Sequence, residues 1–217
     1  VKAVENALEV APSPATVLMR TLLTESQFIS SHVLHTYFLV APDVVNLPSV
    51  IPLAGSHPDV VKRALRMKKL ANDYTSVFAG GRMLHPVNPT IKGFYKIPSR
   101  EEVAEILKRL ENTREDVEET VKLWATFKLP HYTRETEYIS LRSREEFALY
   151  DGEIYSSVKG TIPVADYRSV TNEFVVPHST SKRCKHTRAS YQVGALARVN
   201  NNYDQLLPSA RKAAERL

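Results

Sequence analysis

Apolar residues recur at three- and four-residue steps over much of the chain, a spacing that predicts amphipathic helices. The first helix begins at Ser13 and Pro14, a good N-cap followed by a residue that a first helical turn tolerates. It continues to Ala41-Pro42, about 27 residues or about 40 Å. Charged and polar residues interrupt its apolar length, which argues against a membrane span. A helix buried in a large helical bundle is favoured instead.

Two further helices are predicted from their opening residues. Ser56 to Asp59 has the form of a capping box and starts a helix that ends before Gly80. Ser99 to Glu102 repeats that form and starts a helix to about Phe127. A break is predicted at Asn112-Thr113, where Thr113 with Asp116 could cap a new helix.

The pattern changes after Leu129, where short runs of Tyr, Thr and Ile predict strands. Asp151-Gly152 between apolar residues predicts a hairpin, and a last helix is predicted over Pro208 to Leu217. The fold class is therefore mainly α with a small β insertion (α+β). We expect one partial domain, with a helical bundle over 1–128, a strand-rich insertion over about 135–176 and a segment over 177–217 that returns to the bundle. The pattern suggests that the chain both begins and ends within an element.

Composition narrows the functional classes only slightly. The formal charge is +5 and the pI is about 9.2, which we attribute to solvated faces spread over the surface. One cysteine, Cys184, excludes an intrachain disulfide and is compatible with a cytoplasmic location. Cys184 with His178 or His186 matches no zinc-binding spacing, so an ordinary surface loop is favoured there.

Three segments together resemble the large subunit of nickel-iron hydrogenases. The first runs from Val1 to Phe38 and includes Ser31-His32-Val33-Leu34-His35-Thr36-Tyr37-Phe38. The second is Gly80-Gly81-Arg82-Met83-Leu84-His85-Pro86-Val87-Asn88-Pro89, followed by Gly93-Phe94-Tyr95. The third runs from Pro177 to Lys182 and then from Tyr191 to Asn200. Their order and separation make chance agreement improbable, and the third is the most specific.

The resemblance implies a long-helix bundle around a nickel-iron centre that is held by two Cys-x-x-Cys pairs, both of which this sequence lacks. The family reaction is the reversible oxidation of H2 to protons and electrons. Thiolates stabilise a nickel that takes the hydride while a nearby base takes the proton. We therefore expect no catalytic residue, no metal ligand and no bound cofactor in this chain alone. The implied partner is the iron-sulfur small subunit, and the resemblance also allows further electron-transfer subunits.

By this resemblance, Arg20, Ser31, His32 and His35 are structural residues or lie around the metal ligands. The two histidines share a helical face, and we expect them to be buried and hydrogen-bonded within the bundle rather than to form a metal pair. Arg20 in so apolar a helix needs a carboxylate, for which Glu5 is one candidate. Some family members carry an acid where this sequence has Ser31, which weakens a proton-relay role at that position.

Gly80, Gly81, Arg82 and His85 are predicted to face the small subunit. Adjacent glycines let the backbone approach a neighbour closely, and Pro86 holds His85 in extended geometry. Lys92 stands where the resemblance leads us to expect a glycine. Two later residues, Gly194 and Arg198, are expected at a structural crossing where backbone passes close to the bundle, with Arg198 paired internally.

Two alternatives from other classes stay open at this point. One is a metal-free relative of the same fold, of the type of the quinone-site subunit of respiratory complex I, against which the run Val193 to Asn200 argues. The other is a non-enzymatic binding module that grips nucleic acid with Lys182 to Arg188, although aromatic residues are not interleaved there.

Overall fold

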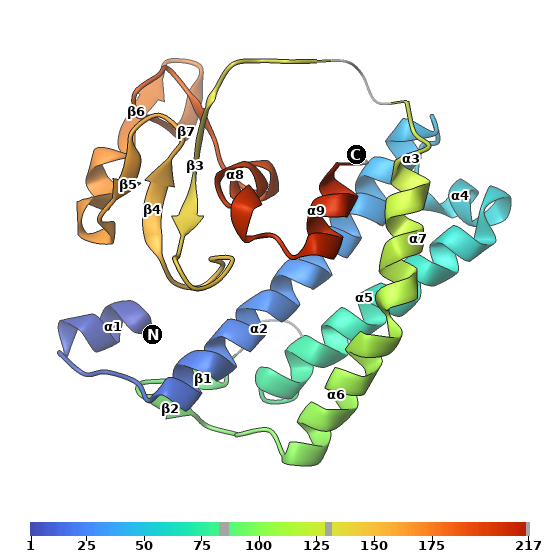
Figure 1. Ribbon diagram of the computed structural model, residues 1–217, viewed down its shortest axis with the longest axis horizontal. Coiled ribbons are helices and arrows are strands. Elements are labelled where there is room, and N and C mark those ends of the chain that lie inside the picture. Colours follow the sequence, from blue (N-terminus) through green and yellow to red (C-terminus); the bar gives the residue numbers. More distant parts are fainter. Residues whose placement is uncertain (83–86, 129–131, 216–217) are drawn as a thin grey trace. The chain divides into compact units, whose positions relative to one another are not determined.

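The computed structural model describes residues 1–82, 87–128 and 132–215. The chain divides into two compact units, Val1–Leu129 and Pro130–Leu217, which we describe separately (Figure 1). In the part of the chain described, no helix is both long and apolar enough to cross a membrane. The predicted fold class, mainly α with small sheets, is confirmed.

The first unit is helical, with one short hairpin. Its elements are α1 (Lys2–Ala7), α2 (Pro14–Val33), the π-helix η1 (Leu34–Val40), α3 (Ala41–Val44), α4 (Val50–Ser56), α5 (Pro58–Phe78), β1 (Pro89–Thr90), β2 (Gly93–Phe94), α6 (Arg100–Asn112) and α7 (Arg114–Trp124). Strands β1 and β2 pair antiparallel, and Figure 1 shows them beside the N-terminal end of α2.

The long first helix begins as predicted and ends later than predicted. The Ser13 hydroxyl accepts the Thr16 backbone N–H at 3.2 Å and caps α2. The helix then widens to π geometry in η1 and continues as α3, past the predicted end at Ala41-Pro42. Pro42 lies at one of the first positions of α3, directly after η1, and because its ring nitrogen carries no hydrogen it donates no backbone hydrogen bond to the preceding helical turn.

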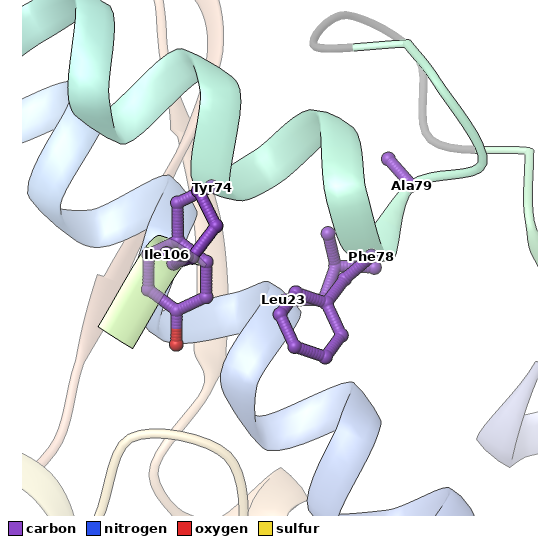
Figure 2. Packing of buried hydrophobic residues seen from close by; sticks show 5 residues of the cluster. All are labelled: Leu23, Tyr74, Phe78, Ala79 and Ile106. Atoms are coloured by element: carbon purple, nitrogen blue, oxygen red, sulfur yellow. The ribbon is translucent and has the colours of Figure 1, made fainter. Parts of the chain in front are cut away.

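The core of the first unit lies where α2 and α5 pack along each other. Figure 2 shows one buried cluster, in which α2, α5 and α6 each contribute side chains: Leu23, Tyr74, Phe78, Ala79 and Ile106. A second cluster joins η1 to α5 and contains Val33, Tyr37, Ala64 and Met67. The Tyr37 hydroxyl reaches Thr120 of α7 at 2.6 Å, so this phenol keeps a polar partner although its side chain is buried.

The later helices begin where the sequence predicts, but only one of their three predicted side-chain caps forms. Ser99 and Glu102 form the predicted capping box. Ser56 instead ends α4, so α5 begins after His57 without a side-chain cap. The break at Thr113 is confirmed, yet its hydroxyl donates back to the Arg109 carbonyl at 2.8 Å and caps nothing. Asp116, the proposed partner of that cap, pairs with Arg66 at 2.6 Å.

The second unit combines two small sheets with short helices. Its elements are β3 (Glu137–Arg142), β4 (Glu153–Ser156), β5 (Gly160–Ile162), the 3-10 helix η2 (Val164–Ser169), β6 (Asn172–Val176), β7 (Ser179–Lys185), β8 (Tyr191–Gln192), α8 (Ala195–Asn201), the 3-10 helix η3 (Tyr203–Gln205) and α9 (Pro208–Ala214). One sheet has the order β5-β4-β3-β8, in which β3 and β8 are parallel, and the other pairs β6 with β7.

Strands continue to Gln192, so the strand-rich region is longer than the predicted 135–176. The predicted hairpin exists between β3 and β4, but residues 143–152 connect the strands and Asp151-Gly152 is not a two-residue turn. Gly152 is needed at φ +141°, because a Cβ there would lie 2.8 Å from the Arg142 carbonyl oxygen. That residues 177–217 return to the bundle stays a prediction.

Candidate functional site

Arg20 and Glu5 form a two-pronged ion pair inside the first unit. The Arg20 Nη1 and Nη2 atoms donate to the Glu5 Oε2 and Oε1 atoms, each at 2.8 Å. Both side chains are buried, so neither charge is screened by bulk water. The predicted pairing of Arg20 with Glu5 is therefore confirmed.

The turn between β1 and β2 completes this network. The Lys92 backbone N–H donates to Glu5 Oε1 at 2.6 Å, and Arg20 Nη2 donates to the Thr90 carbonyl at 2.9 Å. The Thr16 hydroxyl donates to the Lys92 carbonyl at 3.2 Å. The hydrogen bonds from Arg20 and Lys92 lower the pKa of Glu5 from 4.5 to about 2. The carboxylate stays charged at neutral pH.

The backbone conformation of Lys92 explains why a glycine is expected at its position. Its φ is +63°, in the left-handed region that side chains with a Cβ disfavour. The conformation is the one that directs the Lys92 N–H into Glu5. Lysine in place of glycine therefore adds strain to the turn, while the hydrogen bond from the Lys92 N–H to Glu5 is kept.

Ser31, His32 and His35 are exposed in the 217-residue chain, so burial of the two histidines within a larger bundle stays a prediction. The buried side of α2 instead contains Ser26, which accepts a hydrogen bond from Thr75 at 2.9 Å. The His32 ring packs edge-to-face on Phe28 with centroids 5.9 Å apart. A role for these three residues around a metal centre stays a prediction.

Gly80, Gly81 and Arg82 are exposed, and His85 lies outside the described residues. Both glycines have positive φ, which accounts for the pair. Only one of the two approaches a neighbour closely in the part of the structure described: a Cβ on Gly80 would lie 3.1 Å from Asn88 Cγ, whereas Gly81 borders open space. Asn88 is itself buried and donates to the Phe78 carbonyl at 2.9 Å, which fixes the end of this loop.

A second buried carboxylate, which the sequence reasoning missed, lies in the second unit. Glu137 Oε1 accepts from Ser156 Oγ at 2.5 Å and from His186 Nδ1 at 2.6 Å. Its Oε2 accepts from the Thr187 backbone N–H at 3.2 Å and hydroxyl at 2.5 Å. One signal could have found it: strand alternation puts Glu137 on the same face as Ile139, which is also buried.

The donors to Glu137 determine its charge. Burial alone would raise its pKa, but the hydrogen bonds from Ser156, Thr187 and His186 outweigh burial and lower the pKa from 4.5 to about 2. A carboxylate only accepts hydrogen bonds, so His186 must carry a proton on Nδ1. Glu137 therefore links β3, the end of β4 and the residues after β7.

The side chains present do not fit a nickel-iron centre. Across residues 1–82, 87–128 and 132–215, no three His, Cys, Asp or Glu side chains gather as a metal site. The sequence supplies one thiol, Cys184, and a thiolate-held nickel needs several. Cys184 instead hydrogen-bonds Tyr191, whose pKa rises to about 12 through burial and this contact.

The third resembling segment forms β8 and α8. Gly194 is the residue before α8 and has φ +89°, so its conformation requires glycine. In the part of the chain described, nothing lies within 4 Å of a Cβ built there, and the expected close crossing with the bundle stays a prediction. The following asparagines tie α8 to the sheet, since Asn201 Nδ2 donates to Ser140 Oγ at 3.0 Å and Asn202 Nδ2 to the Leu141 carbonyl at 3.1 Å.

No family model matches the chain. Among curated proteins it is 29% identical to the alpha subunit of sulfhydrogenase 1 of Pyrococcus furiosus over 99% of this chain and 50% of that protein. It is also 29% identical to a vhu F420-non-reducing hydrogenase subunit of Methanocaldococcus jannaschii over 92% of this chain and 53% of that protein. The chain thus spans about half the length of these relatives.

A solved structure decides between the interpretations. The chain superposes on an NAD+-reducing [NiFe]-hydrogenase in the H2-reduced state with a TM-score of 0.82, at 25% identity, over 95% of this chain and 51% of that chain. The resemblance to nickel-iron hydrogenase large subunits is confirmed. Nearly the whole chain is similar to about half of each of these hydrogenase chains, and the complex I-type and nucleic-acid-binding alternatives are not favoured.

Proposed function

We propose that this chain is an interior segment of a nickel-iron hydrogenase large subunit whose full-length protein catalyses the reversible oxidation of H2. The observation that supports this most strongly is the superposition of 95% of the chain on about half of a [NiFe]-hydrogenase chain. The hydrogenase relatives in sequence cover nearly the whole chain as well.

The metal centre in this proposal belongs to the full-length protein. Bound there, nickel with thiolate ligands would supply the site that takes a hydride from H2. The single thiol of this chain does not meet that need, so we propose that the ligands come from polypeptide outside these 217 residues. The segment itself contributes the long α2–η1 helix and its packing on α5.

Ser31, His32 and His35 are proposed to lie around that centre once the rest of the large subunit is present. Their exposure supports this, because two large apolar side chains on the same stretch, Ile29 and Leu34, are also exposed. Exposed apolar side chains grouped with polar ones are typical of a surface that another polypeptide covers.

The iron-sulfur small subunit is the proposed partner, and Gly80, Gly81, Arg82 and His85 are proposed to face it. The relatives are named as hydrogenase subunits, which supports partner subunits in general. The hairpin that follows this loop exposes three large apolar side chains, Val87, Ile91 and Tyr95. A cytoplasmic location stays a prediction.

The test compares the product of the whole coding sequence around this segment, purified with its partner subunit, with the 217-residue chain. We expect nickel and iron by elemental analysis and H2-dependent dye reduction in the former. For the isolated chain we expect neither stoichiometric nickel nor dye reduction. Nickel bound stoichiometrically by the isolated chain, or a full product without Cys-x-x-Cys pairs and without nickel, contradicts the proposal.

The partner assignment is tested separately by introducing a charge beside the loop, on the hairpin that follows it. Tyr95→Glu should reduce co-purification of the small subunit, because the Tyr95 ring is exposed and would no longer offer apolar area. Tyr167→Glu, at an exposed tyrosine in the second unit, is the matched control. Equal recovery of the small subunit with both variants would contradict a partner at this loop.

A further inference from the structure

The second half of the α2–η1 helix has an exposed face without charge. Over residues 26–42 the sequence contains no Asp, Glu, Lys or Arg. Four exposed residues follow one another there at four-residue steps, and we call them the α2–η1 stripe: Gln27, Ser31, His35 and Leu39. A helix face that meets water ordinarily carries charged side chains, so an uncharged row of this length is more typical of a covered face.

The π-helix η1 keeps this stripe on one side of the helix. In an α-helix a four-residue step exceeds the turn of about 3.6 residues, so a row at that spacing drifts around the helix. A π-helix has wider turns, so the same step falls short of a turn and the row drifts back. Because the stripe passes from α2 into η1 near its middle, the two drifts oppose each other. Its four side chains therefore leave the helix on nearly the same side.

The buried side of the helix has the same spacing. Val33, Tyr37 and Ala41 lie at four-residue steps, and no more than 6% of each is exposed. Val33 and Tyr37 pack with Met67 of α5, and the Tyr37 hydroxyl reaches Thr120 of α7. One row thus faces α5 and α7, and the stripe is a second row whose direction is set by the same π segment.

Apolar side chains lie within the stripe and beside it. Leu39 is 56% exposed, and the flanking Ile29 and Leu34 are 37% and 42% exposed. Apolar area without charge is characteristic of the buried centre of a contact, where charged residues are depleted. The face therefore has the composition of a contact surface.

We propose that the α2–η1 stripe is the seat of a helix with an apolar face, contributed by the same large-subunit polypeptide outside residues 1–217, and that η1 sets the register of this contact. The proposal rests on the proposed function. The length of the relatives favours this occupant over a separate subunit. The chain matches 50% of the sulfhydrogenase 1 alpha subunit and 51% of the solved hydrogenase chain, so a comparable length of polypeptide is available within one such subunit.

Maleimide labelling of introduced cysteines tests this contact. Gln27→Cys, Ser31→Cys and Leu39→Cys are made one at a time, both in the 217-residue chain and in the product of the whole coding sequence. Peptide mass spectrometry measures the labelling rate at each position. All three cysteines should react freely in the 217-residue chain. In the full product, with or without its partner subunit, each should react about tenfold more slowly or less, because labelling then requires local opening.

Leu18→Cys is the matched control. Leu18 is 60% exposed and belongs to the same helix. It lies about two and a half turns before Gln27, which places the two residues on opposite sides of α2. This cysteine should react at similar rates in both proteins.

Four results would overturn the proposal. Rapid labelling of the stripe in the full product would leave the face uncovered, and protection only with the partner subunit would make that subunit the occupant. Protection already in the 217-residue chain would mean that the chain itself or a second copy covers the face. Equal protection of Leu18→Cys would show that coverage is not specific to the stripe.

Two further outcomes separate the parts of the argument. Protection of Gln27→Cys and Ser31→Cys without protection of Leu39→Cys would contradict the role of η1 in the register. A full product that binds nickel and still labels rapidly would contradict this contact alone. A full product without nickel and without Cys-x-x-Cys pairs would contradict the proposed function.

Discussion

Glu5 in the first unit and Glu137 in the second are both almost fully buried, with 1% and 0% of their surface exposed, yet different donors stabilise their charges. Glu5 faces a permanent cation, Arg20. Glu137 faces two hydroxyls, a backbone N–H and an imidazole that is charged only when protonated. The pKa of each carboxyl falls to about 2. Hydrogen bonds from mainly neutral donors can therefore hold a buried carboxylate as ionised as an arginine can.

The two networks differ in how much of their unit depends on them. Both large apolar clusters belong to the first unit, where Glu5 lies apart from them. Among the described residues of the second unit, the buried apolar side chains are Ile139, Ala148, Val170 and Ala197. Two of these four are alanines, so little apolar area is buried there. We infer that Glu137 carries a larger share of the stability of its unit than Glu5 does.

Glu137→Ala should have the largest effect. It leaves the donors from Ser156, His186 and Thr187 facing a void, and we expect the second unit to lose about 3–5 kcal/mol of unfolding free energy. Hydrogen exchange resolved by peptide measures each unit separately. Glu135→Ala is the matched control, because Glu135 is 85% exposed and pairs only at the surface with Arg188. Loss of protection in both units alike, or a loss no larger than that of the control, would contradict the comparison.

Mild acid should lower the unfolding free energy of both units, by less than Glu137→Ala lowers that of the second unit. A carboxyl whose folded pKa lies below its unfolded pKa contributes stability that is fully present above about 4.5 and is lost as the pH falls toward 2. Thermal unfolding followed by circular dichroism from pH 6 to pH 2 should show a decline that begins below about 4.5. In Glu137→Ala the remaining acid dependence of the second unit should be shallower. Stability that is constant from pH 5 to pH 3 would show that these carboxyls do not limit it.

The sequence predicted the helices well because helix signals are local. Ser99 and Glu102 lie within one turn of each other, so their reciprocal bonds follow from spacing alone. The pairing of Arg20 with Glu5 was also foreseeable, since a cation in an apolar helix needs a nearby acid. The same local logic failed at Ser56, where a short helix, α4, occupied the residues that were expected to cap α5.

The strand-rich unit was predicted less completely because its contacts are distant in sequence. The donors to Glu137 lie 19 to 50 residues away, and no spacing rule links them. The parallel pairing of β3 with β8 likewise joins residues that are far apart in the sequence. The surroundings of His32 and His35 could not be predicted for a different reason: a helical pattern shows which residues share a face, but not whether another segment covers that face.

Lys92→Gly should have the smallest effect and should act only on the Glu5 side of the comparison. Glycine adopts φ +63° without the strain that a Cβ causes, so we expect the first unit to gain about 1 kcal/mol while the backbone N–H still donates to Glu5. Lys92→Ala keeps the Cβ and removes only the exposed amine chain, so it should leave stability nearly unchanged. Denaturant unfolding followed by the fluorescence of Trp124, the single tryptophan, reports on the first unit. If glycine and alanine shift the midpoint equally, the loss of the amine chain and not the relief of backbone strain accounts for the change.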